Sequence, residues 1–253
     1  MTSADASGEA RQAALATLEG EIVSCFKCPR LVEWRERVAR EKVARYRAEP
    51  YWGRPLSGFG DPDARIFVIG LAPAAHGGNR TGRVFTGDAS GDFLWAALHR
   101  AGLADRPSSR RANDGLTVTD VRIGAAVRCA PPANKPTIEE RDTCAPYLVR
   151  ELGALDRVRV VVALGKFGWD AALRALERLG ASPPSPRPTF GHLAEARIGR
   201  WHLLGSYHPS QQNTFTGRLT PPMFDAVIER AKVLADGQAI RGGAQASASQ
   251  PST

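Results

Sequence analysis

Short apolar runs alternate with helical segments through the middle of this chain, and that alternation restricts the fold more than any other feature. The runs are rich in valine, isoleucine and leucine, which is typical of strands buried on both faces. They lie at 66–71, 116–127 with a break, 158–164 and 201–205. Helices are predicted between them at 93–101, 138–152 and 168–179. The pattern predicts an α/β fold, a three-layer α/β/α sandwich whose central sheet has four mostly parallel strands.

Polar loops rich in glycine or proline follow the carboxyl end of each predicted strand. They occupy 72–88, 128–136, 165–168 and 206–219. In open parallel sheets, ligands bind outside the carboxyl ends of the strands, so we expect these loops to converge on one cleft. The proline-dense stretch at 182–188 is expected to be a rigid surface connection before the last strand.

The four cysteines form a close pair, Cys25 and Cys28, followed far downstream by Cys129 and Cys144. A CxxC pair can occupy two adjacent coordination positions, and two distant thiolates can complete a tetrahedral shell. The spacing therefore predicts a structural zinc ion or an iron–sulfur cluster. Two disulfides are the alternative. We expect no secretory signal at the start of the chain, and reduced thiols inside cells rarely pair, so the metal site is favoured.

Composition limits the class of protein. The chain has 253 residues, of which 43% are hydrophobic, so it can bury a sizeable core. No apolar run approaches the length of a membrane span, and we expect a monomeric, cytoplasmic protein with no membrane partner. The net charge of +8 indicates a polyanionic partner such as nucleic acid. The excess of arginine over lysine is also typical of a GC-rich genome, which would explain the charge without a partner.

The two ends differ from the middle. Residues 1–9 and 237–253 have almost no large apolar side chains, and we predict disordered tails there. A single domain is expected at 10–236, including the N-terminal segment that carries the cysteine pair. Helices are predicted at 10–24 and 31–47, on either side of that pair.

Two motifs and the order of the cysteines resemble the family 5 (type B) uracil-DNA glycosylases. The first motif reads GLAPAAHG at 70–77 and TGRVFTGD at 81–88, and the last reads SYHPSQQNT at 206–214 and continues to Arg218. The resemblance covers about residues 25–230. It implies a [4Fe–4S] cluster on Cys25, Cys28, Cys129 and Cys144. It also implies excision of uracil from DNA, together with hypoxanthine, xanthine and ethenocytosine, that leaves an abasic site without a lyase step.

The resemblance assigns catalytic roles to three residues. His208 would donate a hydrogen bond to a uracil carbonyl oxygen and stabilise the departing base anion. Asp88 would position or activate the attacking water and balance the cationic sugar. Asn134 would contact the water or the edge of the base. Judged from the residues alone, His208 could be structural, and Asp88 could cap the helix expected to begin near Gly91.

A base pocket is also implied, with Phe85 stacking on uracil, although the same residue could be a core phenylalanine that anchors its loop. The implied base-binding positions are Gly70, Ala72, Ala74, Phe85 and Asn213. Ala72 stands where family 4 enzymes carry an acidic residue. The resemblance therefore assigns activation of the attacking water to Asp88. Ala125 stands where relatives have a uracil-reading asparagine, so we expect looser recognition of uracil.

The segment 210–218 is expected to enter the minor groove and fill the gap left by the flipped nucleotide. Gln212 occupies the wedge position, where relatives often have leucine. Arg218 and Arg83 are candidates for phosphate contacts, and an ordinary solvated arginine is the alternative for each.

Two other functions compete with this one. A non-catalytic DNA-binding module with a structural zinc would use the cysteines only to fasten the fold. A glycosylase that traps its product through a histidine would need a basic insertion ending in histidine after the first motif, and 77–86 offers only Asn79, Arg80 and Arg83.

Overall fold

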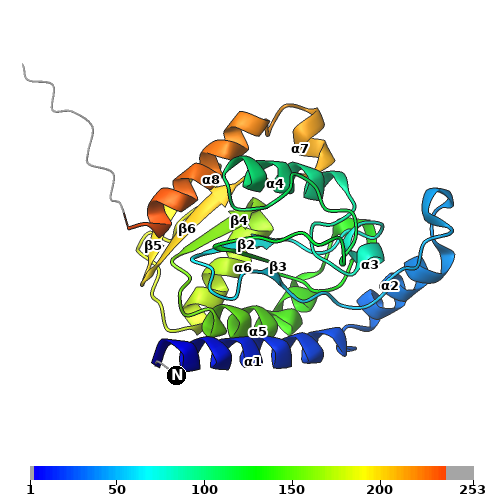
Figure 1. Ribbon diagram of the computed structural model, residues 1–253, viewed down its shortest axis with the longest axis horizontal. Coiled ribbons are helices and arrows are strands. Elements are labelled where there is room, and N and C mark those ends of the chain that lie inside the picture. Colours follow the sequence, from blue (N-terminus) through cyan, green and yellow to red (C-terminus); the bar gives the residue numbers. More distant parts are fainter. Residues whose placement is uncertain (1–2, 238–253) are drawn as a thin grey trace, which may run out of the picture.

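The computed structural model describes residues 3–237 and contains one six-stranded sheet in the order β1-β3-β2-β4-β6-β5 (Figure 1). Four central strands run parallel: β2 (Ile66–Gly70), β3 (Val121–Ala125), β4 (Val160–Leu164) and β6 (Trp201–Ser206). These are the four predicted strands, with β3 restricted to the second part of 116–127. The predicted fold class is confirmed.

The sheet has more strands than the four predicted. Short antiparallel strands, β1 (Phe59–Gly60) and β5 (Glu195–Ile198), pair with β3 and β6 at the two edges. Strand β1 has two residues, too few to produce a pattern. Strand β5 exposes Glu195 and Arg197 to solvent, so it contains no apolar run.

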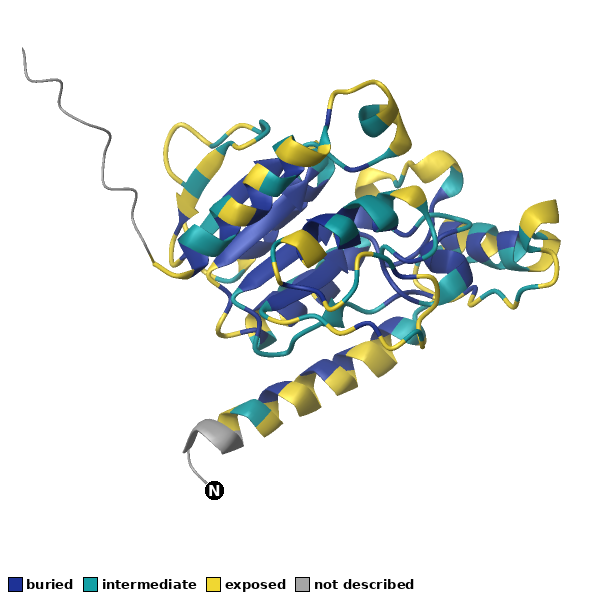
Figure 2. Cartoon of the chain, turned by 45° about the horizontal axis from the view of Figure 1, so that its top comes forward, coloured by how far each residue is buried: buried dark blue, intermediate teal, exposed yellow. Residues whose placement is uncertain are grey.

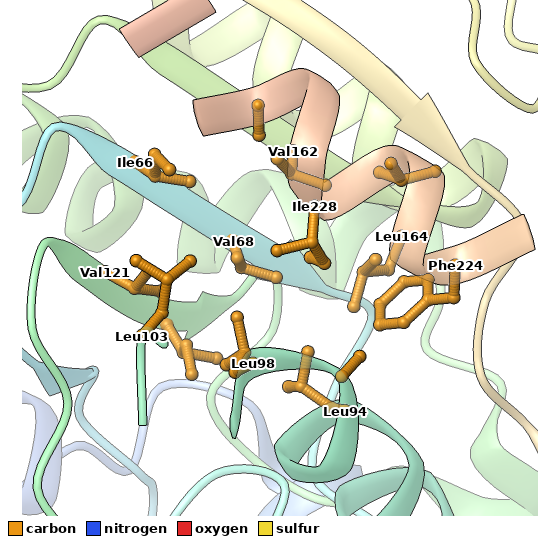
Figure 3. Packing of buried hydrophobic residues seen from close by; sticks show 14 of the residues in the cluster. Ile66, Val68, Leu94, Leu98, Leu103, Val121, Val162, Leu164, Phe224 and Ile228 are labelled. Carbon is orange, nitrogen blue, oxygen red and sulfur yellow. The ribbon is translucent and has the colours of Figure 1, made fainter. Parts of the chain in front are cut away.

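Helices cover both faces of the sheet. On one face lie α4 (Ala89–Arg100) and α8 (Pro221–Ala235), and on the other lie α5 (Ile138–Ala154) and α6 (Gly165–Arg178). Figure 3 shows Val68 of β2 packed between Leu98 of α4 and Ile228 of α8. The next residue of β2, Ile69, is buried on the opposite face with Leu152 of α5. Burial on both faces explains the continuous apolar runs (Figure 2).

The N-terminal helix α1 (Ser3–Val23) lies along α5 and contributes Leu15 to the core on that face. It begins at Ser3, so the predicted tail at 1–9 is helical where the structure describes it. Its described part, 3–9, contains two alanines and one glutamate, which favour helix, and no large apolar residue. Residues 238–253 of the predicted C-terminal tail lie outside the described residues. Within 3–237, no helix combines the length and apolar character needed to cross a membrane.

Shorter elements surround the carboxyl edge of the sheet. Helix α2 (Pro29–Glu41) ends before the predicted 47, and the 3₁₀ turn η1 (Ala44–Tyr46) follows it. Helix α3 (Gly78–Thr81) and the 3₁₀ turn η2 (Pro132–Asn134) lie in the loops after β2 and β3, and α7 (Gln211–Phe215) lies after β6.

Candidate active site and cysteine cavity

The rings of Phe85 and His208 meet where β2 and β6 end, with centroids 6.1 Å apart and planes inclined by 30°. Phe85 has a left-handed backbone, with φ of +48°, and its carbonyl oxygen accepts a hydrogen bond from Trp95 Nε1 at 2.6 Å. Its ring lies directly on the backbone of Gly70, where a Cβ would be 2.7 Å from Phe85 Cζ. Gly70 therefore makes room for the aromatic ring.

His208 lies against the start of α6, where a Cβ on Gly165 would be 3.4 Å from His208 Cβ. Part of the residue is exposed, but the surrounding protein desolvates the imidazole and lowers the pKa of His208 to about 4. The ring is consequently neutral at pH 7. A neutral imidazole offers one N–H donor, which suits an oxygen that gains negative charge during a reaction.

Asp88 caps the N-terminus of α4, because its Oδ1 accepts a hydrogen bond from Gly91 N at 2.9 Å. The structural role anticipated from the sequence is therefore confirmed. Its Oδ2 faces Gly77 in the first motif, where a Cβ would lie only 1.8 Å away. Burial raises the pKa of Asp88, and the N–H groups of Gly91 and Ser90 oppose this rise. One oxygen thus anchors the helix, while the other lies against the first motif.

The segment 210–218 is tied to His208 by Asn213, whose Nδ2 donates to the His208 carbonyl oxygen at 2.8 Å. Asn213 thus orients the backbone of the histidine. Gln212 is exposed on α7, three residues before Phe215, so the two side chains share one face of the helix. Phe215 is 79% exposed, the most exposed of the large hydrophobic residues in the described chain. The sequence analysis missed it, although it is the only aromatic residue between 210 and 218.

The two predicted phosphate contacts differ in structure. Arg218 is exposed, and its guanidinium lies 4.7 Å from the centroid of the Tyr207 ring. Arg83 is only 5% exposed; it pairs with Asp114 and donates to the Ala112 carbonyl oxygen at 3.0 Å. Its prediction as a DNA contact is corrected, because the guanidinium is committed to holding a loop together.

Within residues 3–237, no hydrogen bond or ring contact joins three further predicted site residues to Phe85 or His208. Asn134 is exposed in η2 with φ of +55°, and its side chain makes no hydrogen bond to residues within 3–237. Ala72 packs toward the side of the molecule that holds Cys28 and Cys129. Ala74 supplies a backbone carbonyl to Asn79 N at 3.1 Å, which closes the turn before α3.

All four cysteines have free thiols and line one small, mainly apolar cavity. Cys25 and Cys28 come from the junction of α1 and α2, Cys129 from the loop after β3, and Cys144 from α5. Burial raises the pKa of Cys129 to about 12 and that of Cys144 to about 11. The four cysteines thus share one cavity, and the metal or cluster site stays a prediction.

Two fully buried arginines flank the cavity with unused hydrogen-bond donors. Arg35 Nη1 donates to Cys129 Sγ at 3.0 Å, and its Nη2 lies 3.9 Å from Glu36 Oε1. Among the described residues, Nε and Nη2 of Arg35 and Nε and Nη1 of Arg128 have no hydrogen-bond partner. Glu151 is shared between Arg128 and Arg122, at 2.6 and 2.8 Å. Positive charge therefore exceeds negative charge here, which suits an anionic group held by thiolates in the cavity.

The chain resembles curated glycosylases over most of its length. The family model of the Uracil DNA glycosylase superfamily matches residues 57–232. The Type-5 uracil-DNA glycosylase of Mycobacterium tuberculosis is 54% identical over 220 residues, which cover 86% of this chain and 81% of that protein. The Type-5 uracil-DNA glycosylase of Thermus thermophilus is 53% identical, with 85% and 95% covered, and the Type-4 enzyme of Pyrobaculum aerophilum is 30% identical, with 75% and 79% covered. With the motifs, the cysteines and the sheet in agreement, the chain belongs to the uracil-DNA glycosylase superfamily and, within it, to the type-5 group.

Proposed function

We propose that this protein removes uracil from single- and double-stranded DNA by hydrolysing the N-glycosyl bond and leaves an abasic site. We extend the proposal to hypoxanthine, xanthine and ethenocytosine, because Ala125 offers no side-chain amide to select uracil. Membership of the type-5 group makes the chain a hydrolase of N-glycosyl bonds. The neutral His208 beside the Phe85 ring is the observation that carries the proposal.

On the base side of the bond, Phe85 would stack on the flipped base, and Gly70 would let the base and the ring approach the backbone. Negative charge develops on the base as it leaves. The N–H of His208 would stabilise that charge without transferring a proton, because the ring is already neutral. Asn213 supports this role by fixing the His208 carbonyl.

On the sugar side, positive charge develops as the bond breaks. Asp88 can oppose that charge and orient water with the oxygen that does not cap α4. Asn134 stays a prediction, since it is exposed on the loop after β3. We propose no lyase step: Lys166, beside Gly165, has a side chain that is 73% exposed and paired with Asp170 at 2.8 Å.

Phe215, with Gln212 on the same helix face, is our candidate for the wedge that replaces the flipped nucleotide. An exposed phenylalanine costs little to withdraw from water, and its ring can fill a gap between stacked base pairs. Arg218, on the exposed loop after α7, could contact the DNA backbone.

We propose that Cys25, Cys28, Cys129 and Cys144 hold a [4Fe–4S] cluster. Their lining of one cavity and their order along the chain support the proposal. The unpaired donors of Arg35 and Arg128 support an anionic cluster. When bound, the cluster would fasten the α1–α2 junction to β3 and α5; four thiolate ligands leave it no open position for substrate.

The test is excision from a labelled oligonucleotide with one uracil, treated with alkali to cut at abasic sites. We expect alkali-dependent cutting by the native chain and a loss of about 100- to 1000-fold in His208→Ala. If Asp88→Ala cuts as well as the native chain, activation of the attacking water would be assigned to Asn134 or to a phosphate of the substrate. No release of any of the four bases by iron-loaded protein would overturn the enzyme assignment, and colourless protein loaded with zinc would overturn the cluster.

A further inference from the structure

A groove of about 750 Å³ lies beside the first motif and takes no part in the function proposed above. Both aromatic residues and arginines line it. They include Tyr46, Tyr51, Trp52, Arg110, Arg111 and Asn113. Its floor includes Gly87, the residue before Asp88. The Tyr51 hydroxyl is 3.0 Å from His76 Nδ1, a ring atom of the first motif, so the groove borders the candidate active site.

Trp52 is held as a fixed, flat surface in this groove. Its Nε1 donates to the Pro55 carbonyl oxygen at 3.1 Å. The indole lies against Gly82, where a Cβ would be 3.3 Å from Trp52 Cδ2. Even so, the residue is 40% exposed. A rigid indole that is partly open to solvent can stack on an unpaired base of any sequence.

The positive charge of the loop that carries Arg110 and Arg111 is not compensated. Arg80 pairs with Glu49, so these two cancel within the groove. The exposed guanidinium groups of Arg110 and Arg111 form no ion pair or hydrogen bond with residues of the described chain. Asp114, the nearest carboxylate in sequence, is engaged by Arg83 and by Arg110 N at 2.8 Å. The loop therefore presents two free cations to the groove that Trp52 also lines.

We propose that this groove binds the unpaired stretch of substrate strand next to the target nucleotide, with one base stacked on Trp52 and two phosphates at Arg110 and Arg111. Single-stranded DNA matches both kinds of lining residue, because its exposed bases can stack on the indole and its charged backbone can pair with the arginines. This proposal rests on the proposed function, since it names a part of the substrate that the excision site does not contact.

Binding is measured first with an oligothymidine that contains no uracil, so excision is not required. Fluorescence quenching should occur in the native chain and fall in Trp52→Phe. The affinity of Arg110→Ala/Arg111→Ala should drop about tenfold, and the slope of log K against log salt should decrease by about 1.4, at about 0.7 for each phosphate of a single strand. The matched control is Arg197→Ala/Arg200→Ala, which removes two exposed arginines near the β5–β6 turn.

Excision is then compared on a single-stranded 20-mer and on a uracil trinucleotide too short to reach the groove. We expect KM for the 20-mer to rise about tenfold in Trp52→Ala and in the Arg110/Arg111 variant, with the trinucleotide unchanged. Two results would overturn the proposal that the groove binds the strand. One is an equal loss of affinity in the Arg197/Arg200 control, and the other is unchanged oligothymidine binding in the groove variants. Absence of excision with intact groove-dependent binding would overturn the proposed function alone.

Discussion

Replacing Gly77 by alanine should disable the protein through a single methyl group. The added Cβ would lie 1.8 Å from Asp88 Oδ2, and side-chain carbon atoms do not approach other heavy atoms within 3.0 Å. The carboxylate must therefore move by more than about 1 Å. Displacement of a catalytic group by this distance can cost about 100-fold in rate. We expect a loss of about that size in single-turnover excision.

The same movement should weaken α4. Asp88 Oδ1 holds Gly91 N at 2.9 Å, and loss of an N-cap bond costs about 1 kcal/mol in unfolding free energy. Asp88→Asn separates the two effects, since asparagine caps a helix as well as aspartate but carries no charge. It should retain near-native stability and lose activity.

A double-mutant cycle, measured by excision kinetics and urea unfolding, tests the role of the Asp88 carboxylate. In an Asp88→Ala background, Gly77→Ala should cause little further loss of activity, because the carboxylate that the added methyl group would displace is already absent. Gly20→Ala is the control: Gly20 is exposed on α1, no atom lies within 4 Å of its added Cβ, and helix propensity should raise stability slightly. Native activity in Gly77→Ala, or fully additive losses in the cycle, would refute the role given to the Asp88 carboxylate.

Three other changes are expected to act separately. Phe215→Ala should reduce excision from duplex DNA about tenfold and leave the melting temperature unchanged, because the side chain is 79% exposed; kinetics on duplex and single strands would measure this. Arg83→Gln should lower the unfolding free energy by about 3 kcal/mol and leave salt-dependent DNA binding intact, since it breaks a buried pair; urea titration and a salt series would test this. Desolvation lowers the pKa of His208 from 6.5 to about 4, so the folded state resists the proton that the unfolded state accepts. Stability should therefore fall as pH drops from about 6.5 to 4, by on the order of 3 kcal/mol, and His208→Gln should flatten that fall in urea titrations.

The central strands could be predicted because burial on both faces requires continuous apolar runs. The edge strands could not, since β1 is too short and β5 alternates exposed and partly buried residues. The start of α1 was also missed: residues 3–9 have only small and acidic side chains, so they resemble a polar tail when only apolar spacing is considered.

At the site, the motifs selected Phe85 and His208, whose rings meet, and Asp88, which caps α4 beside Gly77. Arg83 was misassigned because a sequence shows charge without the partner that neutralises it, here Asp114 in a later loop. Phe215 escaped notice because exposure cannot be read from residue type. The desolvation of His208 likewise depends on residues distant in sequence.

The unpaired donors of Arg35 and Arg128 have a consequence for the supply of active protein. With the cysteine cavity empty, buried donors of both arginines would lack hydrogen-bond partners, and the α1–α2 junction would lose its attachment to β3 and α5. Chains that fail to acquire iron and sulfide would spend more time unfolded and be removed by proteases. On the proposed ligation, the repair capacity of the cell would follow its iron nutrition through the abundance of this protein, with no need for a dedicated sensor.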